Sequence, residues 1–242
     1  MINNLLYLCL FHIIADFYAQ NDHIAHEKKK KYKYVLIHSL QYWTVFLVLS
    51  ILCFEKNALI VSSITSVCHY STDTIKYLYT KCKMKRCSDS MLFIFDQAVH
   101  FVSIVIIIYL YRFEICWIDI INKFVLEFAI DLNKTAKLLL VLLLIGKPSN
   151  ILIQQLLNSY RPKKNYCIIK SDAKAGRLIG TLERLLILIL LVNDGYTAIG
   201  FVLTAKSLVR YDKITKDPGF SEYYLLGTLL STLIAIICST LL

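Results

Sequence analysis

Long runs of apolar residues are the feature that most limits how this chain can fold. Three of them are VFLVLSILCF at 45–54, FVSIVIIIYLY at 101–111 and LLLVLLLIG at 138–146. Runs of this kind between charged loops are typical of helices that cross a lipid bilayer. Hydrophobic residues make up 57% of the chain, which is more than an average soluble domain contains. We therefore predict an all-α fold, a polytopic bundle of transmembrane helices.

The apolar segments predict about eight spans. These are residues 2–20, 35–54, 57–79, 90–112, 135–158, 175–192, 196–211 and 222–242. The fifth span is interrupted by GKPSN, and Pro and Gly at membrane depth must be buried within protein. An amphipathic segment separates two halves. We predict a four-span N-terminal bundle over 1–112, a connector over 113–134 and a four-span C-terminal half over 135–242.

The net charge of +10 alone would be compatible with a nucleic-acid partner. The basic residues, however, gather in four loops, residues 21–34, 80–89, 159–174 and 210–221. These loops contain five, four, five and three Lys or Arg, whereas the alternate connections contain one, three and none. Positively charged loops stay on the cytoplasmic side of a membrane. We therefore expect both termini outside, membrane lipids as partners and no nucleic acid, and the oligomeric state stays open.

Four His residues lie inside the first four predicted spans, and three of them have an Asp four positions away. The residues are His12 with Asp16, His38, His69 with Asp73, and Asp96 with His100. Positions i and i+4 share one face of a helix. The helical rise places the whole set roughly 5 to 15 Å inside the cytoplasmic ends of spans that run in alternate directions. We infer that these side chains meet in one layer.

A cation would explain such a layer. An ionised Asp at membrane depth costs several kcal/mol unless it is paired or bound to metal. Imidazole and carboxylate ligands suit Zn²⁺, Mn²⁺ or Fe²⁺. We expect His38 to be a ligand or a general base, and either two metals or one metal with supporting side chains. The expected metal ligands are His12, Asp16, His69, Asp73, Asp96 and His100.

Two other interpretations of the layer stay open. The His and Asp side chains would also serve as hydrogen bonds that hold the helices together. A pathway for protons or metal ions would use the same residues. The outer halves of the first four spans are nearly all apolar, which argues against a route across the membrane.

We make separate predictions for the polar residues that lie near this layer in the sequence. Gln20 lies four residues after Asp16 and would bind substrate or cap its helix. Gln97 follows Asp96 directly and is expected to point elsewhere on its helix. The two His residues of the basic loop, at 23 and 26, are expected to be solvated.

The second half carries its own charged residues in the cytoplasmic halves of its spans. They are Arg177, Glu183, Arg184, Lys206, Arg210 and Glu222. Glu183 and Lys206 are natural partners for a buried charge pair. The alternative is a basic pocket for a phosphate or a lipid headgroup.

The motifs resemble a known family. H-x-x-x-D-F-x-x-Q at 12–20, H-x-x-x-D at 69–73 and D-Q-x-x-H at 96–100 look like the bacterial membrane family of domain of unknown function 3307. The strings GRLIGTLERLL, IGFVLTAKSLVRY and EYYLLGTLLS are similar to its long form. The resemblance implies the bacterial cytoplasmic (inner) membrane but little mechanism.

The His and Asp layout is also similar in residue type to predicted membrane-bound metal-dependent hydrolases. The leading hypothesis is therefore a metal-dependent hydrolase that acts at the cytoplasmic face on a lipid or lipid-linked substrate. The first rival is a transporter of divalent cations or protons. The second is a non-enzymatic membrane sensor or assembly subunit.

Overall fold

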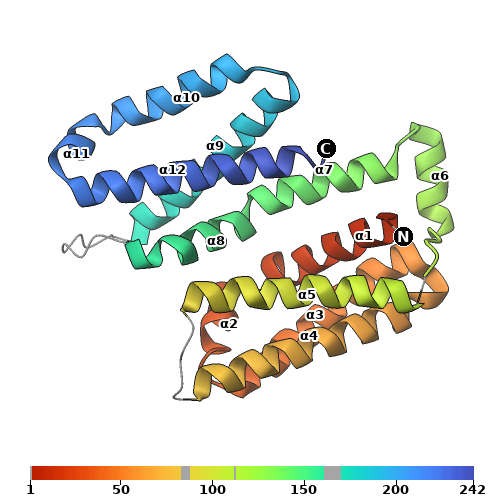
Figure 1. Ribbon diagram of the computed structural model, residues 1–242. Helices are drawn as coiled ribbons and strands as arrows, with labels where there is room; N and C mark the ends of the chain where they lie inside the picture. Colours follow the sequence, from red (N-terminus) through yellow and green to blue (C-terminus); the bar gives the residue numbers. More distant parts are fainter. Residues whose placement is uncertain (1, 83–87, 112, 161–169) are drawn as a thin grey trace. The chain divides into compact units, whose positions relative to one another are not determined.

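The computed structural model describes residues 2–82, 88–111, 113–160 and 170–242, and over these ranges it contains helices and no strands (Figure 1). The all-α prediction is confirmed for this part of the chain. Parts of two basic loops predicted at 80–89 and 159–174 lie outside the described residues.

Four helical segments within the described ranges are long and apolar enough to cross a membrane, fewer than the eight spans predicted. They are α3 (Tyr32–Phe54), α5 (Asp89–Tyr111), Leu132–Leu157, and α12 (Pro218–Ser239). The Leu132–Leu157 segment consists of α7 (Leu132–Ile145) and α8 (Lys147–Leu157).

The remaining predicted spans are too short or too polar to count as candidate membrane helices. α1 (Ile2–Ile13) with its continuation η1 (Ile14–Tyr18) is apolar but short, and so is α10 (Tyr196–Val209). α4 (Ala58–Lys81) is 24 residues long, but it carries several polar side chains. α9 (Lys170–Val192) begins in the charged sequence KSDAKAGR. The polar residues of α4 and the charged start of α9 thus lower the hydropathy of these two long helices.

The chain forms two compact units, Met1–Leu140 and Val141–Leu242. In the first unit, α3 and α4 form a hairpin through the short turn η2 (Glu55–Asn57), and α5 packs beside α4. α1 packs against α3 and α5.

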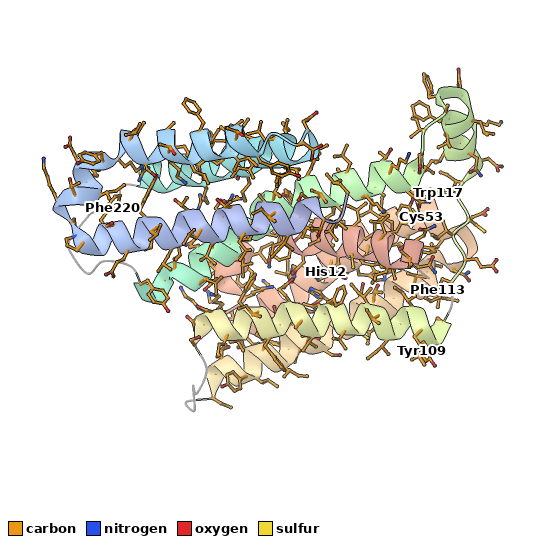
Figure 2. The ribbon with its side chains drawn as sticks, turned by 45° about the horizontal axis from the view of Figure 1, so that its top comes forward. His12, Cys53, Tyr109, Phe113, Trp117 and Phe220 are labelled. Carbon is orange, nitrogen blue, oxygen red and sulfur yellow. The ribbon has the colours of Figure 1, made fainter. Side chains whose placement is uncertain are left out.

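Two short helices mark the ends of the first unit. α2 (Asp22–Glu27) lies at one end and α6 (Asp119–Phe128) at the other (Figure 1). We call these the α2 end and the α6 end. Figure 2 shows Cys53, Phe113 and Trp117 at the α6 end, while His12 lies between the two ends.

The beginning of the predicted connector is fastened to the α6 end. The Asn4 side-chain amide donates a hydrogen bond to the backbone carbonyl of Phe113. The backbone N–H of Cys116 donates to the carbonyl of Cys53 at 2.9 Å. These bonds satisfy backbone groups of an irregular segment that would otherwise be left without partners at the end of an apolar bundle.

The first unit places polar groups inside and apolar groups outside. On α5, Asp96 and His100 are buried, with 5% and 2% exposed. The same helix exposes Phe95 and Phe101, at 69% and 51%. Many large apolar side chains on the outside of a helix bundle, together with buried ionisable groups in its interior, are typical of membrane proteins. The chain is therefore a membrane protein.

The second unit is built around α9 and α12, which pack along each other. α8 packs against both, and α10 lies against α9. A short helix, α11 (Tyr211–Lys216), leads from α10 into α12, near the residue labelled Phe220 in Figure 2. The hydrophobic core of the second unit includes the buried side chains of Val141, Ile145, Leu188 and Cys238.

The break between α7 and α8 falls at Gly146, within the GKPSN sequence. A broken helix leaves backbone carbonyls without their usual N–H partners. Ser149 Oγ donates to the Leu144 carbonyl at 2.5 Å, and Arg184 Nε donates to the Ile145 carbonyl at 2.8 Å. The break is thus stabilised by side chains, one of which comes from α9.

Candidate metal centre

All seven residues of the predicted polar layer are buried, and none is more than 8% exposed. They come from four segments, α1 with η1, α3, α4 and α5. The structure brings them together within the first unit, where each contacts at least one other member through a ring or an ion-pair distance. We call these seven side chains the His/Asp cluster.

Asp16 holds a central position because the helix widens around it. Residues Ile14–Tyr18 form a π-helical turn, in which the N–H of Ala19 bonds to the carbonyl of Ile14 at 2.8 Å. Such turns are rare and often occur at functional sites. Asp16 Oδ1 lies 3.1 Å from His38 Nε2 and 3.5 Å from His69 Nε2. One carboxylate therefore joins three helical segments.

Aromatic stacking orders the imidazoles. His69 stacks on His100, with ring centroids 4.4 Å apart, and on Tyr42, with centroids 3.9 Å apart. The Tyr42 hydroxyl also lies 3.1 Å from His12 Nδ1. Tyr42 is a member of the site that the sequence analysis missed. Its position four residues after His38 placed it on the same helix face and was the available signal.

Two groups of three residues have ligand atoms close enough to share a metal ion. The first is Asp16, His38 and His69, and the second is His69, Asp73 and His100. Within each group, the ligand atoms all lie within 4.8 Å of one another. His69 belongs to both groups. The geometry therefore accommodates one cation on either side of a shared imidazole, or one cation that uses part of the cluster.

Several ligand atoms of the cluster have no hydrogen-bond partner within the described part of the chain. They are His12 Nε2, both ring nitrogens of His69, His100 Nε2 and Asp96 Oδ1. Native proteins leave few buried polar atoms unsatisfied, and each such atom needs an explanation. Neutral imidazole nitrogens and carboxylate oxygens are good ligands for Zn²⁺, Mn²⁺ and Fe²⁺, so the residues present fit a metal ion.

Two Lys side chains also reach the cluster, and the sequence analysis did not single them out. Lys28 Nζ lies 3.2 Å from Asp73 Oδ2, and Lys76 Nζ lies 2.6 Å from Asp96 Oδ2. Burial would lower the pKa of Lys28, but the nearby carboxylates outweigh burial and raise its pKa. Lys28 therefore stays charged. Lys76 lies three residues after Asp73 on α4, a spacing that offered a signal.

One expectation about the glutamines was wrong. Gln97 does not point away from the cluster, because its Nε2 donates to Asp16 Oδ2 at 3.2 Å and lies 3.4 Å from Asp96 Oδ2. The side-chain amide is long enough to reach across from α5, although its neighbour in sequence already faces the cluster. Gln20 is buried just after η1, and a role in substrate binding stays a prediction. The imidazoles at 23 and 26 are exposed.

Two of the charged residues named in the second half, Lys206 and Arg210, meet at the ring of Tyr224, and Lys206 Nζ lies 5.5 Å from the ring centroid. Lys206 Nζ donates to Glu183 Oε2 at 2.5 Å. The Arg210 guanidinium lies over the ring of Tyr224, 5.7 Å from its centroid. Arg177 is exposed. A pocket for a headgroup at these residues stays a prediction.

Arg184, which the sequence analysis named among the charged residues but gave no role in a site, makes several internal polar contacts in the second unit. It is 1% exposed. Besides the Ile145 carbonyl, its guanidinium donates to Asn150 Oδ1 at 2.7 Å and Ser231 Oγ at 3.2 Å. The pairing predicted in this segment involved the neighbouring Glu183, whereas Arg184 faces the interior of the second unit.

Comparison with known proteins identifies the first unit. No curated protein and no solved structure matches the chain. The family model described as "Protein of unknown function (DUF3307)" matches residues 4–129, a range that contains the whole His/Asp cluster and ends within the predicted connector. The second unit lies beyond the match, so the long form of the family stays a prediction there. Because the match covers more than half of the chain, the protein belongs to the DUF3307 family.

Proposed function

We propose that the first unit binds a divalent metal, Zn²⁺, Mn²⁺ or Fe²⁺, and hydrolyses a lipid or lipid-linked substrate at the cytoplasmic face of the inner membrane. The supporting observation is the pair of ligand groups that share His69, whose two ring nitrogens are buried without a hydrogen-bond partner among the described residues. Buried imidazole nitrogens of this kind are suited to bind a metal ion.

The residues take different roles in this proposal. His12, Asp16, His69, Asp73, Asp96 and His100 are the metal ligands or hold the ligands in place. A bound divalent metal would polarise a phosphoryl or acyl oxygen and lower the pKa of a water molecule. His38 is either a ligand, in the group with Asp16 and His69, or the general base. Its Nε2 faces Asp16 Oδ1 at 3.1 Å, and if this nitrogen carries the proton, Nδ1 is the basic nitrogen that accepts one.

The membrane placement belongs to the same proposal. All eight apolar segments cross the bilayer, with the α2 end in the cytoplasm and the α6 end outside. The basic loops and the outward-facing apolar side chains support this arrangement. α6 exposes Ile120, Phe124 and Phe128, which suits a helix that lies along the outer interface. A lipid substrate follows from this position of the cluster.

The test is turnover by the full chain in detergent. A panel would contain phospholipids, a polyprenyl diphosphate and acyl esters, with release of phosphate, headgroup or fatty acid as the readout. The proposal predicts turnover of at least one class, lost with a chelator and in His38→Ala but kept in the exposed control His23→Ala. Absence of turnover with the metal-loaded protein, or turnover that a chelator leaves unchanged, would contradict hydrolysis.

One observation favours the rival function, an ion or proton pathway. The interior toward the α6 end is less apolar than the sequence analysis expected, because Ser50, Ser62, Thr65 and Ser66 are buried there. Among the described residues, the hydroxyls of Ser50 and Ser66 have no hydrogen-bond partner. The expectation had counted Ser and Thr as part of apolar runs, although buried hydroxyls can accompany an ion.

Large apolar side chains are buried among these hydroxyls as well, which argues against a continuous polar route. Phe46 and Val61 are fully buried beside the hydroxyls in sequence. We therefore rank transport second. Uptake of Mn²⁺ or protons into proteoliposomes, lost in the double variant Ser50→Val with Ser66→Val, would reverse the ranking.

A further inference from the structure

Two ammonium groups lie at the border between the His/Asp cluster and the outside of the first unit. The Lys28 and Lys76 side chains are 17% and 23% exposed, whereas their carboxylate partners, Asp73 and Asp96, are 3% and 5% exposed. Each Lys therefore has one side against a buried carboxylate and another side that opens outward. No other part of the described cluster combines positive charge with access from outside.

Local structure fixes both Lys residues in place. Lys28 ends α2, and its backbone N–H donates to the Ile24 carbonyl at 2.9 Å. Lys76 Nζ lies over the ring of Phe93 at 6.0 Å from the centroid, and Phe93 packs edge-on against Phe17. The two ammonium groups come from separate elements, α2 and α4, yet each is held against the cluster.

Charge counting shows what these groups can do when a metal is present. The three Asp carboxylates and the two Lys residues sum to one negative charge when the imidazoles are neutral. A divalent cation changes this sum to one positive charge, and in the group of His69, Asp73 and His100 it competes with Lys28 for Asp73. An uncompensated positive charge in a poorly solvated site is costly. An anion that reaches the site from outside offsets it.

We propose that Lys28 and Lys76 bind a phosphoryl group beside the metal-loaded cluster. The proposal rests on the proposed function, because it needs the cation. It narrows the substrate from any ester to a phosphorylated one, either a phospholipid headgroup or a small phosphorylated molecule. Lys is a common phosphate ligand and forms charge-assisted hydrogen bonds with phosphate oxygens. Gln97, between two of the carboxylates, adds a neutral donor at the same site.

Binding of inorganic phosphate tests the proposal without any need for turnover. Isothermal titration would use the full chain in detergent, loaded with Mn²⁺. The double variant Lys28→Gln with Lys76→Gln should keep its Mn²⁺ and bind phosphate at least about tenfold more weakly. Lys28→Arg with Lys76→Arg keeps both charges and should bind phosphate within about threefold of wild type.

A matched control separates this site from general attraction by basic loops. Lys29 and Lys33 are exposed in the same stretch of sequence. Their double Gln variant loses the same net charge and should leave phosphate affinity unchanged. Equal weakening in both Gln variants, unchanged affinity at the Lys28 and Lys76 variant, or loss of Mn²⁺ from that variant would overturn the proposal.

Two further titrations distinguish a lipid headgroup from a small phosphorylated molecule. Dihexanoyl phosphatidic acid binding more tightly than glycerol phosphate identifies a lipid, and the reverse order identifies a small molecule; either result supports the site. A wild-type chain that holds no Mn²⁺ would contradict the proposed function, and phosphate binding by that chain would show that the two Lys residues act without a cation. A chain that holds Mn²⁺ but binds no phosphate would contradict this inference alone.

Discussion

The imidazole rings of His69 and His100 stack almost in parallel, with centroids 4.4 Å apart and 9° between their planes. The two residues lie on neighbouring helices, α4 and α5, so the stack also fixes how these helices are aligned. Two imidazolium rings at this distance would repel each other. The stack therefore favours at least one neutral ring, which is the form that binds metal.

Replacing one ring of this stack separates the packing role of His100 from its role as a metal ligand. His100→Phe keeps an aromatic ring against His69 but removes both nitrogens. We expect the helical content to stay and the metal affinity to fall at least about tenfold. Metal titration of the purified variant measures this, with His26→Phe at an exposed position as the control. Unchanged affinity would show that His100 is a packing residue only.

Tyr42 is expected to orient the cluster through its hydroxyl. Tyr42→Phe keeps the stack on His69 and removes the contact with His12 Nδ1. Because residues that orient a ligand affect metal binding, affinity should fall about 10-fold to 100-fold. Tyr109→Phe, which changes an exposed tyrosine on α5, should have no effect. Equal affinities of the two variants would remove Tyr42 from the site.

Arg184 is expected to hold the second unit together. Arg184→Leu leaves the Ile145 carbonyl and the Asn150 side chain without their donor. Loss of hydrogen bonds to a charged, buried group should lower the free energy of unfolding by about 3 kcal/mol. Thermal unfolding in detergent measures the change.

The matched control for this prediction is Arg177→Leu, on the same helix but exposed. It should unfold close to the wild-type temperature. A stable Arg184→Leu protein, or equal damage from both substitutions, would contradict the structural role of Arg184.

The side-chain amide of Asn4 is expected to hold the start of the connector. Without its bond to the Phe113 carbonyl, the backbone bond from Cys116 to Cys53 should open more often. Hydrogen exchange at the Cys116 amide should be about tenfold faster in Asn4→Ala than in wild type. Asn3→Ala, at the exposed neighbouring position, should leave exchange unchanged. Equal exchange in the two variants would show that the connector is held by other contacts.

The sequence predicted the helical fold and the members of the His/Asp cluster for a clear physical reason. Apolar runs of bilayer length have few other uses, and a His and an Asp four residues apart must share a helix face. The number of membrane spans was harder to predict from the sequence. α4 contains His69 and Asp73 because it faces the interior, and these same residues reduce its apolar character.

The contacts that the sequence did not reveal depend on side-chain length and helix geometry. Lys28 lies in a basic loop that looked solvated, yet its ammonium reaches Asp73, 45 residues further along. Gln97 reaches Asp16 from the neighbouring face of α5. The π-helical turn at Asp16 shifts that carboxylate relative to its place in an ordinary α-helix. The residue types in IADFY do not predict such a turn.

The metal content of the purified protein tests the account most directly. Elemental analysis of the detergent-purified wild-type chain should find roughly one or two divalent ions per molecule. His69→Ala and Asp73→Ala should lose this metal while their helical content is kept, and the exposed control His23→Ala should retain it. A wild-type protein without bound metal, or full metal content in both cluster variants, would contradict the account.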